Sequence, residues 1–286
     1  MKKKNVFADL HLHSSASDGL LSPAALVDSS NDKGLKVIAV TDHDTVDGVE
    51  PARIRGNEIG IKVIAGIELS CGWEGRDASI HVLGLFIDEK AASLTGLLQE
   101  QKDFRYRRAL KILDLLEKTG LQVEELRQQF LSTPDRILGR PHIARFLHEK
   151  GYITDFQQAF DRYLSRGCPA YVPKDHVDPV KGIEAIKKAG GIAVIAHPGL
   201  IPDWDVVWQK IEGLPWDGIE AYYSEHTNSQ TKKFCEITAE RGWVASGGSD
   251  YHGDYGKHTN RLGRYGLEQA QYEELLQWCH QHGIAG

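Results

Sequence analysis

The 286-residue sequence has few cysteines and no long apolar run. Its four cysteines stand far apart and form no CxxC pair, so neither a disulfide framework nor a thiolate zinc site is indicated. No apolar stretch approaches the roughly 18 residues of a membrane span. The first residues include three lysines but lack the apolar core of a secretory signal. We therefore expect a soluble, cytoplasmic protein that has no membrane partner.

An excess of positive charge is also missing, since the formal net charge is −6. This balance argues against broad binding of duplex DNA, which needs many phosphate contacts from a basic surface. The sequence contains no GxSxG elbow, no signature of a Cys-His pair and no Walker-type glycine loop. Chemistry through an activated protein nucleophile or a phosphate-binding loop is therefore not indicated.

What the sequence does contain is an alternation of short Val- and Ile-rich runs with longer amphipathic segments. This pattern is typical of successive βα units around a parallel sheet or barrel, and it predicts an α/β fold. We expect seven strands, at residues 5–13, 36–41, 62–70, 79–88, 192–197, 218–223 and 244–246. Helices are expected at residues 22–34, up to Gly60, at 178–190 and at 268–282.

Between about residues 90 and 175 the pattern changes to consecutive helical segments with no convincing strand. We interpret residues 91–175 as a helical insertion into a discontinuous domain made of residues 1–90 and 176–286. The insertion concentrates positive charge in an acidic chain, through Arg105, Arg107, Arg108, Arg136, Arg140, Arg145, Arg162, Arg166 and Lys174. For most of these residues a solvated helix face is the simpler interpretation.

Histidines and carboxylates recur where the predicted strands end. In Asp9-Leu-His11-Leu-His13 the polar residues alternate, and a strand points alternate side chains to one face. Taken alone, such a pair of histidines is more often a half-exposed strand than a metal site. Similar polar residues, however, lie within or after the other apolar runs: His43, Glu68, His81, His197, Asp250 and His252. Because ligands collect at the carboxyl ends of strands in parallel α/β folds, the set predicts a metal site.

The donor types narrow the choice of metal. A mixture of imidazoles and carboxylates suits zinc, manganese or iron better than calcium, which prefers oxygen ligands throughout. Asp9, Asp42 and Asp44 lie beside candidate ligands. They could accept a hydrogen bond from the second ring N–H of a histidine and so orient the ring, or they could equally be turn formers at strand ends. The pair Gly247-Gly248 indicates a close approach of the backbone.

The motifs DLHLHS with Asp18-Gly19, TDHDT, GIELS, IHVLG, AHP and GGSDYH follow one another along nearly the whole chain. In this succession the chain resembles the polymerase-and-histidinol-phosphatase (PHP) superfamily. The resemblance implies a distorted seven-stranded, TIM-like βα barrel, (β/α)7, with two or three divalent metal ions at its mouth, manganese being expected and zinc or iron the alternatives.

Position by position, the resemblance also implies a ligand set. One metal would be bound by His11, His13, Glu68 and Asp250. Glu68 would bridge to a second metal, held also by His81 and His197. A third site would consist of Asp18, His43 and His252, and several family members have histidine at the position of Asp18, so an oxygen ligand here could weaken or change the third metal.

The long helical insertion and its GRPH segment resemble the bacterial branch that includes 3′,5′-nucleoside bisphosphate phosphatases and the 5′-to-3′ exoribonuclease RNase AM. This finer resemblance implies removal of the 3′ phosphate from nucleoside bisphosphates and stepwise degradation of short 5′-phosphorylated single-stranded RNA. Arg140 is the first candidate for gripping phosphate, because a guanidinium forms two parallel hydrogen bonds with it. Lys174, His142 and His226 are further candidates, and His226 could also serve as a general acid.

Three other functions remain open at this level. One is hydrolysis of histidinol phosphate or another small phosphomonoester, although the arginine-bearing insertion favours a doubly anionic substrate. Another is a metal amidohydrolase, which also uses two histidines on a first strand and a late aspartate. The last is a non-catalytic module or metal-binding partner, which the complete set of metal-binding residue types disfavours.

Overall fold

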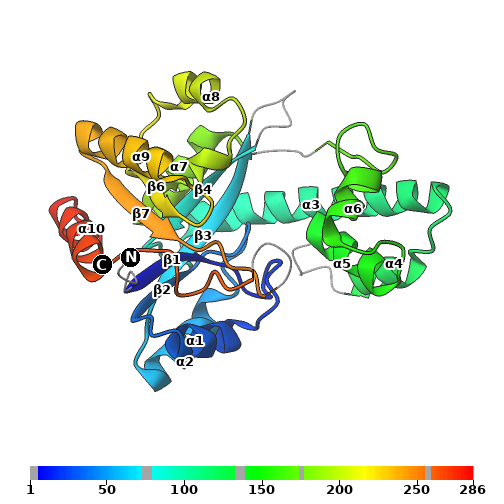
Figure 1. Ribbon diagram of the computed structural model, residues 1–286, viewed down its shortest axis with the longest axis horizontal. Coiled ribbons are helices and arrows are strands. Elements are labelled where there is room, and N and C mark those ends of the chain that lie inside the picture. The colour runs from blue at the N-terminus through cyan, green and yellow to red at the C-terminus, as the bar shows by residue number, and fades with distance from the viewer. Residues whose placement is uncertain (1–5, 73–78, 133–138, 174–176, 255–258, 286) are drawn as a thin grey trace. The chain divides into compact units, whose positions relative to one another are not determined.

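The computed structural model describes residues 6–72, 79–132, 139–173, 177–254 and 259–285. The chain forms two compact units (Figure 1). One consists of Met1–Leu97 together with His176–Gly286, and the other of Leu98–Asp175. The first unit therefore contains both ends of the chain and all seven strands of the described residues.

Seven strands of the first unit pair in chain order into one sheet. The expected strands are all confirmed: β1 (Ala8–Leu12), β2 (Val37–Val40), β3 (Lys62–Gly72), β4 (Ser79–Leu85), β5 (Ile192–Ile195), β6 (Gly218–Tyr223) and β7 (Val244–Gly248). The segment after β7 returns to β1, where the Asp250 amide donates to the His11 carbonyl at 2.9 Å and the His13 amide donates to the Tyr251 carbonyl at 3.0 Å. These bonds bring the last strand back to the first, so the sheet is a nearly closed α/β barrel.

One strand departs from the expected parallel arrangement. β4 pairs antiparallel with both β3 and β5, whereas the remaining neighbours pair in parallel. The expectation of a purely parallel sheet was therefore wrong for β4. Only six residues separate Gly72 from Ser79, and a parallel crossover needs a dozen or more. As a consequence, β4 begins at the end of the barrel where the other strands finish.

The predicted helices of the first unit form with local capping signals. α1 (Pro23–Asp32) begins after Ser22, whose hydroxyl accepts the Ala25 amide at 3.2 Å, and α2 (Val49–Ile59) ends at Gly60, whose φ of 80° closes the helix. α7 (Pro179–Lys188) and α10 (Gln269–Gln281) were also predicted, whereas α8 (Trp204–Ile211) and α9 (Asn228–Arg241) were not. In Figure 1 these helices lie around the strands, with α1 and α2 side by side.

All the regular secondary structure in the described part of the second unit is helical. Its elements are most of α3 (Ala92–Lys118), then α4 (Glu124–Ser132), α5 (Arg140–Glu149), α6 (Phe156–Ala159) and a short π-helix over Phe160–Leu164. It has an apolar core of its own, in which Leu113, Leu116, Phe130 and Leu147 are buried. In the described part of the chain, no helix combines the length and the apolar character needed to cross a bilayer.

The barrel unit separates apolar from polar side chains along its axis. Residues such as Leu10, Leu83 and Val194 are fully buried in its core. Buried histidines and carboxylates lie instead in and after the strand segments that end at the mouth, for example His11 and Glu68. The apolar core thus provides a rigid base on which the polar groups are held.

The four cysteines differ in burial, and this difference can be tested by their reactivity. Cys71 and Cys279 are buried, whereas Cys168 and Cys235 are partly exposed, and burial raises the pKa of the Cys279 thiol to about 11. Because the thiolate is the reactive form, a disulfide reagent at about pH 8 should modify Cys168 and Cys235 first, and Cys71 and Cys279 only after unfolding in guanidinium. Modification of all four thiols at one rate in the native protein would contradict this packing.

Candidate metal centre

The first strand places two imidazoles and a carboxylate at the mouth of the barrel. Asp9 and His11 of β1 and His13 directly after it are all buried. The Nε2 atoms of His11 and His13 lie 3.1 Å apart, and both face the Oδ1 atom of Asp250, at 3.4 and 3.2 Å. With Glu68 they form a group whose donor atoms lie within 4.8 Å of one another. Such spacing suits four ligands around one cation.

Glu68, on β3, lies at the centre of the cluster and is fully buried. Its Oε2 atom lies 3.3 Å from His11 Nε2, 3.2 Å from His13 Nε2 and 3.0 Å from His43 Nδ1. Its Oε1 atom lies 2.7 Å from His81 Nδ1 and 2.9 Å from His197 Nε2. One carboxylate therefore contacts five imidazoles, with its two oxygens facing different sets of them.

Antiparallel pairing explains how His81 reaches this carboxylate. His81 stands near the beginning of β4, opposite Ser70 of β3, whereas the other candidate ligands lie late in or after their strands. Because β4 runs in the opposite direction, its beginning lies at the same mouth. The sequence alone could not distinguish this arrangement from a polar residue in the middle of a parallel strand.

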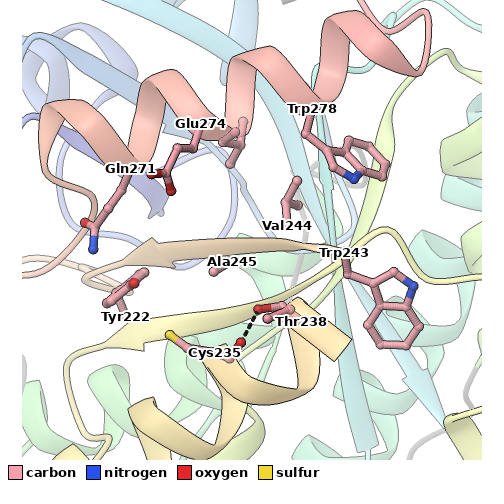
Figure 2. A pocket seen from close by; sticks show the side chains of 11 residues that line it. Tyr222, Cys235, Thr238, Trp243, Val244, Ala245, Gln271, Glu274 and Trp278 are labelled. Atoms are coloured by element: carbon pink, nitrogen blue, oxygen red, sulfur yellow. Dashed lines mark hydrogen bonds between the residues drawn. The ribbon is translucent and has the colours of Figure 1, made fainter. Parts of the chain in front are cut away.

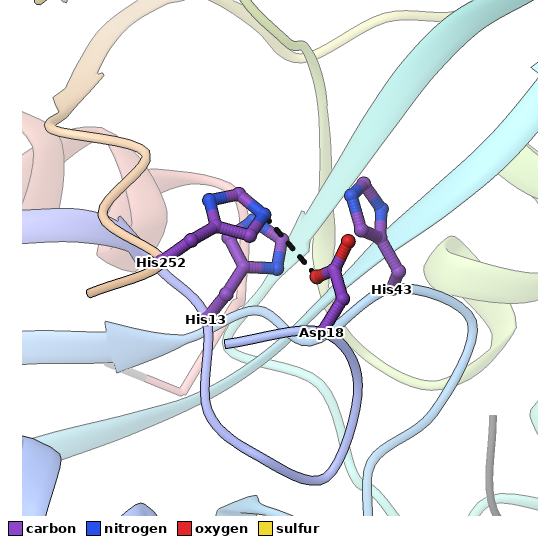
Figure 3. Close-up of side chains that lie close together, drawn as sticks. All are labelled: His13, Asp18, His43 and His252. Atoms are coloured by element: carbon purple, nitrogen blue, oxygen red, sulfur yellow. Dashed lines mark ion pairs between the residues drawn. The ribbon is translucent and has the colours of Figure 1, made fainter. Parts of the chain in front are cut away.

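A further group of donors lies beside the first (Figure 3). It comprises His13, Asp18, His43 and His252, with His252 Nε2 3.2 Å from Asp18 Oδ1 and the rings of His13 and His252 stacked at 4.0 Å. The structure thus brings together all nine residues expected to hold metal. It differs from the expected grouping in two ways. His13 and His43 each belong to two donor groups rather than one, and His197 belongs to none of the three groups, although its Nε2 atom lies 2.9 Å from Glu68 Oε1.

The residues present fit divalent cations. Within the described residues, the buried Oε2 atom of Glu68 and the buried Nδ1 atom of His43 have no hydrogen-bond partner, although each lies close to the other. Buried polar atoms of this kind cost several kcal/mol of desolvation unless another group satisfies them. A mixture of borderline imidazoles and hard carboxylates is a donor set that suits zinc, manganese and iron.

The electrostatics favour cation binding as well. Burial opposes ionisation of Glu68 and Asp250, but the neighbouring histidines outweigh it and hold the pKa of both carboxyls well below their ordinary value. The pKa of Asp18 is lowered well below its ordinary value in the same way, chiefly by His252 and His43 against the effect of burial. The cluster therefore contains three carboxylates that favour the ionised form, which is the form that binds a cation.

The backbone around the mouth adopts conformations that side-chain-bearing residues rarely take. φ is 29° at His197, 52° at Asp250 and 53° at Asp44. Such conformations persist where the surroundings enforce them, and they cluster at functional sites. Here they occur directly after strands, where the chain turns to aim a side chain at the cluster.

Asp9, Asp42 and Asp44 hold the backbone of the mouth. Asp9 accepts the amides of His11 and Ser249, at 3.3 and 2.9 Å. Asp42 accepts the amide and hydroxyl of Ser14, at 2.8 and 2.7 Å, and Asp44 accepts the Ser70 amide at 2.7 Å. Of the two roles considered from the sequence, these contacts match the turn former. Burial raises the pKa of Asp9 to about 7 despite its hydrogen bonds.

Two buried polar residues escaped the sequence analysis. Glu220 and Tyr223 of β6 are buried; Glu220 contacts His11 and the backbone of His197, and Tyr223 contacts Asp250. Glu220 carried the same signal that revealed Glu68, a carboxylate inside an apolar strand. Tyr223 carried none, because an aromatic residue is ordinary in a strand.

Of the four residues predicted to contact the substrate, His226 lies in the barrel unit. His226 directs Nδ1 to the Ala221 carbonyl at 3.1 Å, and its Nε2 accepts the Gly199 amide at 3.0 Å. Burial lowers its pKa. Both ring nitrogens bond the backbone, and these bonds fasten the turn after His197. The roles of His226 as a general acid and a substrate contact stay predictions.

The other three residues predicted to contact the substrate are Arg140, His142 and Lys174, which belong to the helical stretch or border it. Arg140 is the first residue of α5, with its guanidinium 5.5 Å from the centre of the Phe160 ring. His142 lies in the first turn of α5, where its Nδ1 accepts the Gly139 amide at 3.3 Å. Lys174 lies outside the described residues.

A separate pocket of about 300 Å³ lies on the outside of the barrel between α9, β7 and α10 (Figure 2). Its lining includes Tyr222, Cys235, Trp243, Gln271 and Trp278. None of the nine candidate ligands lines it, so it is distinct from the metal centre.

A barrel that gathers nine histidines and carboxylates at its mouth defines a metal-dependent hydrolase, because clustered divalent ions serve to activate water and to stabilise negative charge. Comparison with known families makes the class specific. The sequence model of the PHP domain matches residues 9–167, and the chain belongs to this family.

Several named proteins are similar to this chain over most of its length. A 5′-3′ exoribonuclease of Haemophilus influenzae is 40% identical over 249 residues, 85% of this chain and 89% of the relative. A phosphoribosyl 1,2-cyclic phosphate 1,2-diphosphodiesterase of Eggerthella lenta is 31% identical over 87% of this chain and 95% of its own. A 3′,5′-nucleoside bisphosphate phosphatase of Chromobacterium violaceum is 33% identical over 89% of this chain and 92% of its own.

A solved structure agrees with these relatives. A crystal structure from Bifidobacterium adolescentis, assigned as a metal-dependent phosphoesterase, is 27% identical and superposes with a TM-score of 0.83 over 97% of this chain and 98% of its own. The protein is accordingly a metal-dependent phosphoric ester hydrolase. Membership of the PHP family favours this class over the metal amidohydrolase and the non-catalytic module.

Gly248 offers a test of the site geometry. A Cβ atom there would lie 2.3 Å from His11 Cβ and 2.7 Å from His11 N, which confirms the close backbone approach expected of the glycine pair. Gly248→Ala should displace His11 and weaken metal binding roughly 10–100-fold, as changes around metal ligands commonly do. The measurement is a titration of metal-free protein with Mn²⁺.

Gly213→Ala is the matched control, since a Cβ at this exposed glycine has no atom within 4 Å. Its metal affinity should equal that of the unmodified protein. An unchanged affinity in Gly248→Ala would contradict the close packing of β7 against His11.

Proposed function

We propose that the protein hydrolyses the 3′ phosphate of nucleoside 3′,5′-bisphosphates and also releases nucleotides stepwise from the 5′ end of short 5′-phosphorylated RNA. The observation that carries the proposal is the single buried carboxylate of Glu68 shared among five imidazoles. A site built in this way suits several adjacent cations, and adjacent cations suit in-line attack on phosphorus. The named activities of the H. influenzae and C. violaceum relatives support the choice of substrate.

In this proposal the nine clustered residues hold two or three divalent ions, with Mn²⁺ as the ion we expect. His11, His13, Glu68 and Asp250 hold one ion, and Glu68 with His81 and His197 holds the next. Asp18, His43 and His252 hold the third. When bound, the ions lower the pKa of water and stabilise the negative charge on the phosphoryl oxygens. The protein's own residues contribute by fixing the donors in place, which the buried Glu68 does from the centre.

The helical unit is proposed to supply the residues that recognise the second phosphate. Arg140 is the principal one, because its planar guanidinium can donate two parallel hydrogen bonds to a phosphate. His142 and Lys174 are further candidates in the same stretch of sequence. The concentration of arginine in this otherwise acidic chain supports the assignment.

A second candidate reaction is hydrolysis of a cyclic phosphodiester. The E. lenta relative, named for its action on a cyclic phosphate, favours it as an alternative. Both reactions break a P–O bond with water, so the metal centre serves either. The difference would lie in the residues that contact the rest of the substrate.

A substrate panel tests the proposal. Purified protein with Mn²⁺ should convert adenosine 3′,5′-bisphosphate to AMP and phosphate, release mononucleotides from a 5′-phosphorylated RNA oligomer, and leave AMP intact. Removal of metal with a chelator should abolish both activities, and Mn²⁺ should restore them. Hydrolysis of histidinol phosphate alone, or of a ribose 1,2-cyclic phosphate alone, would show that the substrate has been misassigned.

Arg140→Ala tests the role of the helical unit. Losing a charged hydrogen bond costs about 1.5–3 kcal/mol, so kcat/KM for adenosine 3′,5′-bisphosphate should fall roughly 10–100-fold. Metal content should not change. Arg107→Ala, at an exposed arginine of the same unit, is the control and should retain full activity. Loss of bound metal in Arg140→Ala would mean that the residue supports the metal centre instead.

A further inference from the structure

β6 supplies none of the nine candidate ligands, yet it places two buried polar side chains at the mouth of the barrel. Glu220 is fully buried and Tyr223 is 3% exposed. A buried carboxylate and a buried hydroxyl are retained only where partners satisfy them. The partners of both residues are candidate metal ligands on other parts of the barrel.

An irregularity in β6 brings these two side chains to the same side. Glu220 pairs with Ser246 and Tyr222 with Gly247, so two steps along β6 match one step along β7. In a regular strand, residues 220 and 222 would share a face. The bulge turns Tyr222 outward, where it lines the outer pocket seen in Figure 2, and leaves Tyr223 facing the metal centre. Bulges re-aim side chains in this way beside active sites.

Glu220 joins the first strand to the turn after β5. Its Oε1 atom lies 2.9 Å from His11 Nδ1, and its Oε2 atom accepts the His197 amide at 2.7 Å. A carboxylate can only accept, so Nδ1 of His11 carries a proton, and Nε2, which faces Glu68 and Asp250, is the nitrogen left to bind a metal. The same carboxylate holds the amide of His197, whose φ of 29° needs outside support.

Tyr223 contacts another candidate ligand, Asp250. Its hydroxyl donates to Asp250 Oδ2 at 2.9 Å. The other oxygen of this carboxylate, Oδ1, faces His11 and His13 at 3.4 and 3.2 Å. The hydroxyl thereby fixes which oxygen of Asp250 is presented to the cluster.

We propose that β6 is the positioning strand of the metal centre, in which Glu220 and Tyr223, brought to one side by the bulge, set the orientation of His11, His197 and Asp250 and thereby the metal affinity. The inference rests on the proposed metal site. Neither residue touches the metal in this proposal. Both act through the ligands that they hold.

The substitution Glu220→Gln tests this role, because each of the two carboxylate oxygens of Glu220 accepts a different hydrogen bond. A glutamine has nearly the same shape but only one accepting oxygen, and its amide nitrogen donates. It can satisfy His11 Nδ1–H or the His197 amide, and the other donor then faces an NH₂ group. Tyr223→Phe removes only the hydroxyl and leaves the ring in place, so the fold should tolerate it.

Asp217→Asn is the matched control. Asp217 lies just before β6 and also accepts a backbone amide of β5, that of Ala193 at 2.9 Å, while its other oxygen contacts Lys187. The substitution therefore weakens a similar link between the same two strands at their other end, away from the nine candidate ligands. It should lower the melting temperature of the metal-free protein without changing its metal affinity.

The experiment titrates each metal-free protein with Mn²⁺ by calorimetry and records the visible spectrum after loading with Co²⁺, which reports ligand geometry. Glu220→Gln should bind Mn²⁺ roughly 10–100-fold more weakly and show an altered Co²⁺ spectrum, and Tyr223→Phe should lose about tenfold in affinity. Asp217→Asn should match the unmodified protein in both measurements. Circular dichroism establishes that each variant folds.

The outcomes separate this inference from the proposed function. If the unmodified protein binds no Mn²⁺, the proposed metal site itself fails. If it binds Mn²⁺, and Glu220→Gln and Tyr223→Phe bind it equally well with unchanged Co²⁺ spectra, β6 is not the positioning strand. Should Glu220→Gln not fold, an unchanged affinity in Tyr223→Phe alone overturns the inference.

Discussion

The structure depends on one interaction, the contact of the buried Glu68 carboxylate with five imidazoles. A charged carboxylate in the interior is very costly unless other groups compensate it. The compensating rings come from β1, β4 and the segments after β1, β2 and β5, so their strand ends must converge on one point. The curvature of the barrel is what allows this convergence, because in a flat sheet in the same order β1 and β5 would lie far apart.

Several features of the fold follow from this requirement. β4 runs antiparallel, and so its early residue His81 arrives at the same mouth as the late residues of its neighbours. Gly248 lacks a side chain because His11 occupies the space. Asp9, Asp42 and Asp44 use their carboxylates to hold the backbone of the turns that carry the ligands. The turns that carry the ligands are therefore held in part by hydrogen bonds that involve no candidate ligand side chain.

Much of this was predictable from local pattern. Strands were visible because Val- and Ile-rich runs are short and bounded by turn residues, and His11, Glu68 and His197 stood out because polar residues are rare in such runs. Glu220 is likewise a polar residue inside such a run, although it was not among the predicted site residues. Tyr223 could not have been found, since its role depends on a bulge that shifts the alternation of β6 by one residue. The sequence made His226 a candidate substrate residue, but it could not show that the amide of Gly199 and the carbonyl of Ala221 bond its ring.

The sequence by itself determined the α/β class, the seven strands, the helical stretch and the residue types able to bind metal. These properties are local, because each depends on hydropathy and spacing over a few neighbouring residues. Only the tertiary structure decided which donors face one another, that β4 is reversed, and that His13 and His43 each face two groups. Such contacts join residues as far apart as His11 and Glu220, 209 positions along the chain, and their distance is fixed by barrel closure rather than by any local pattern.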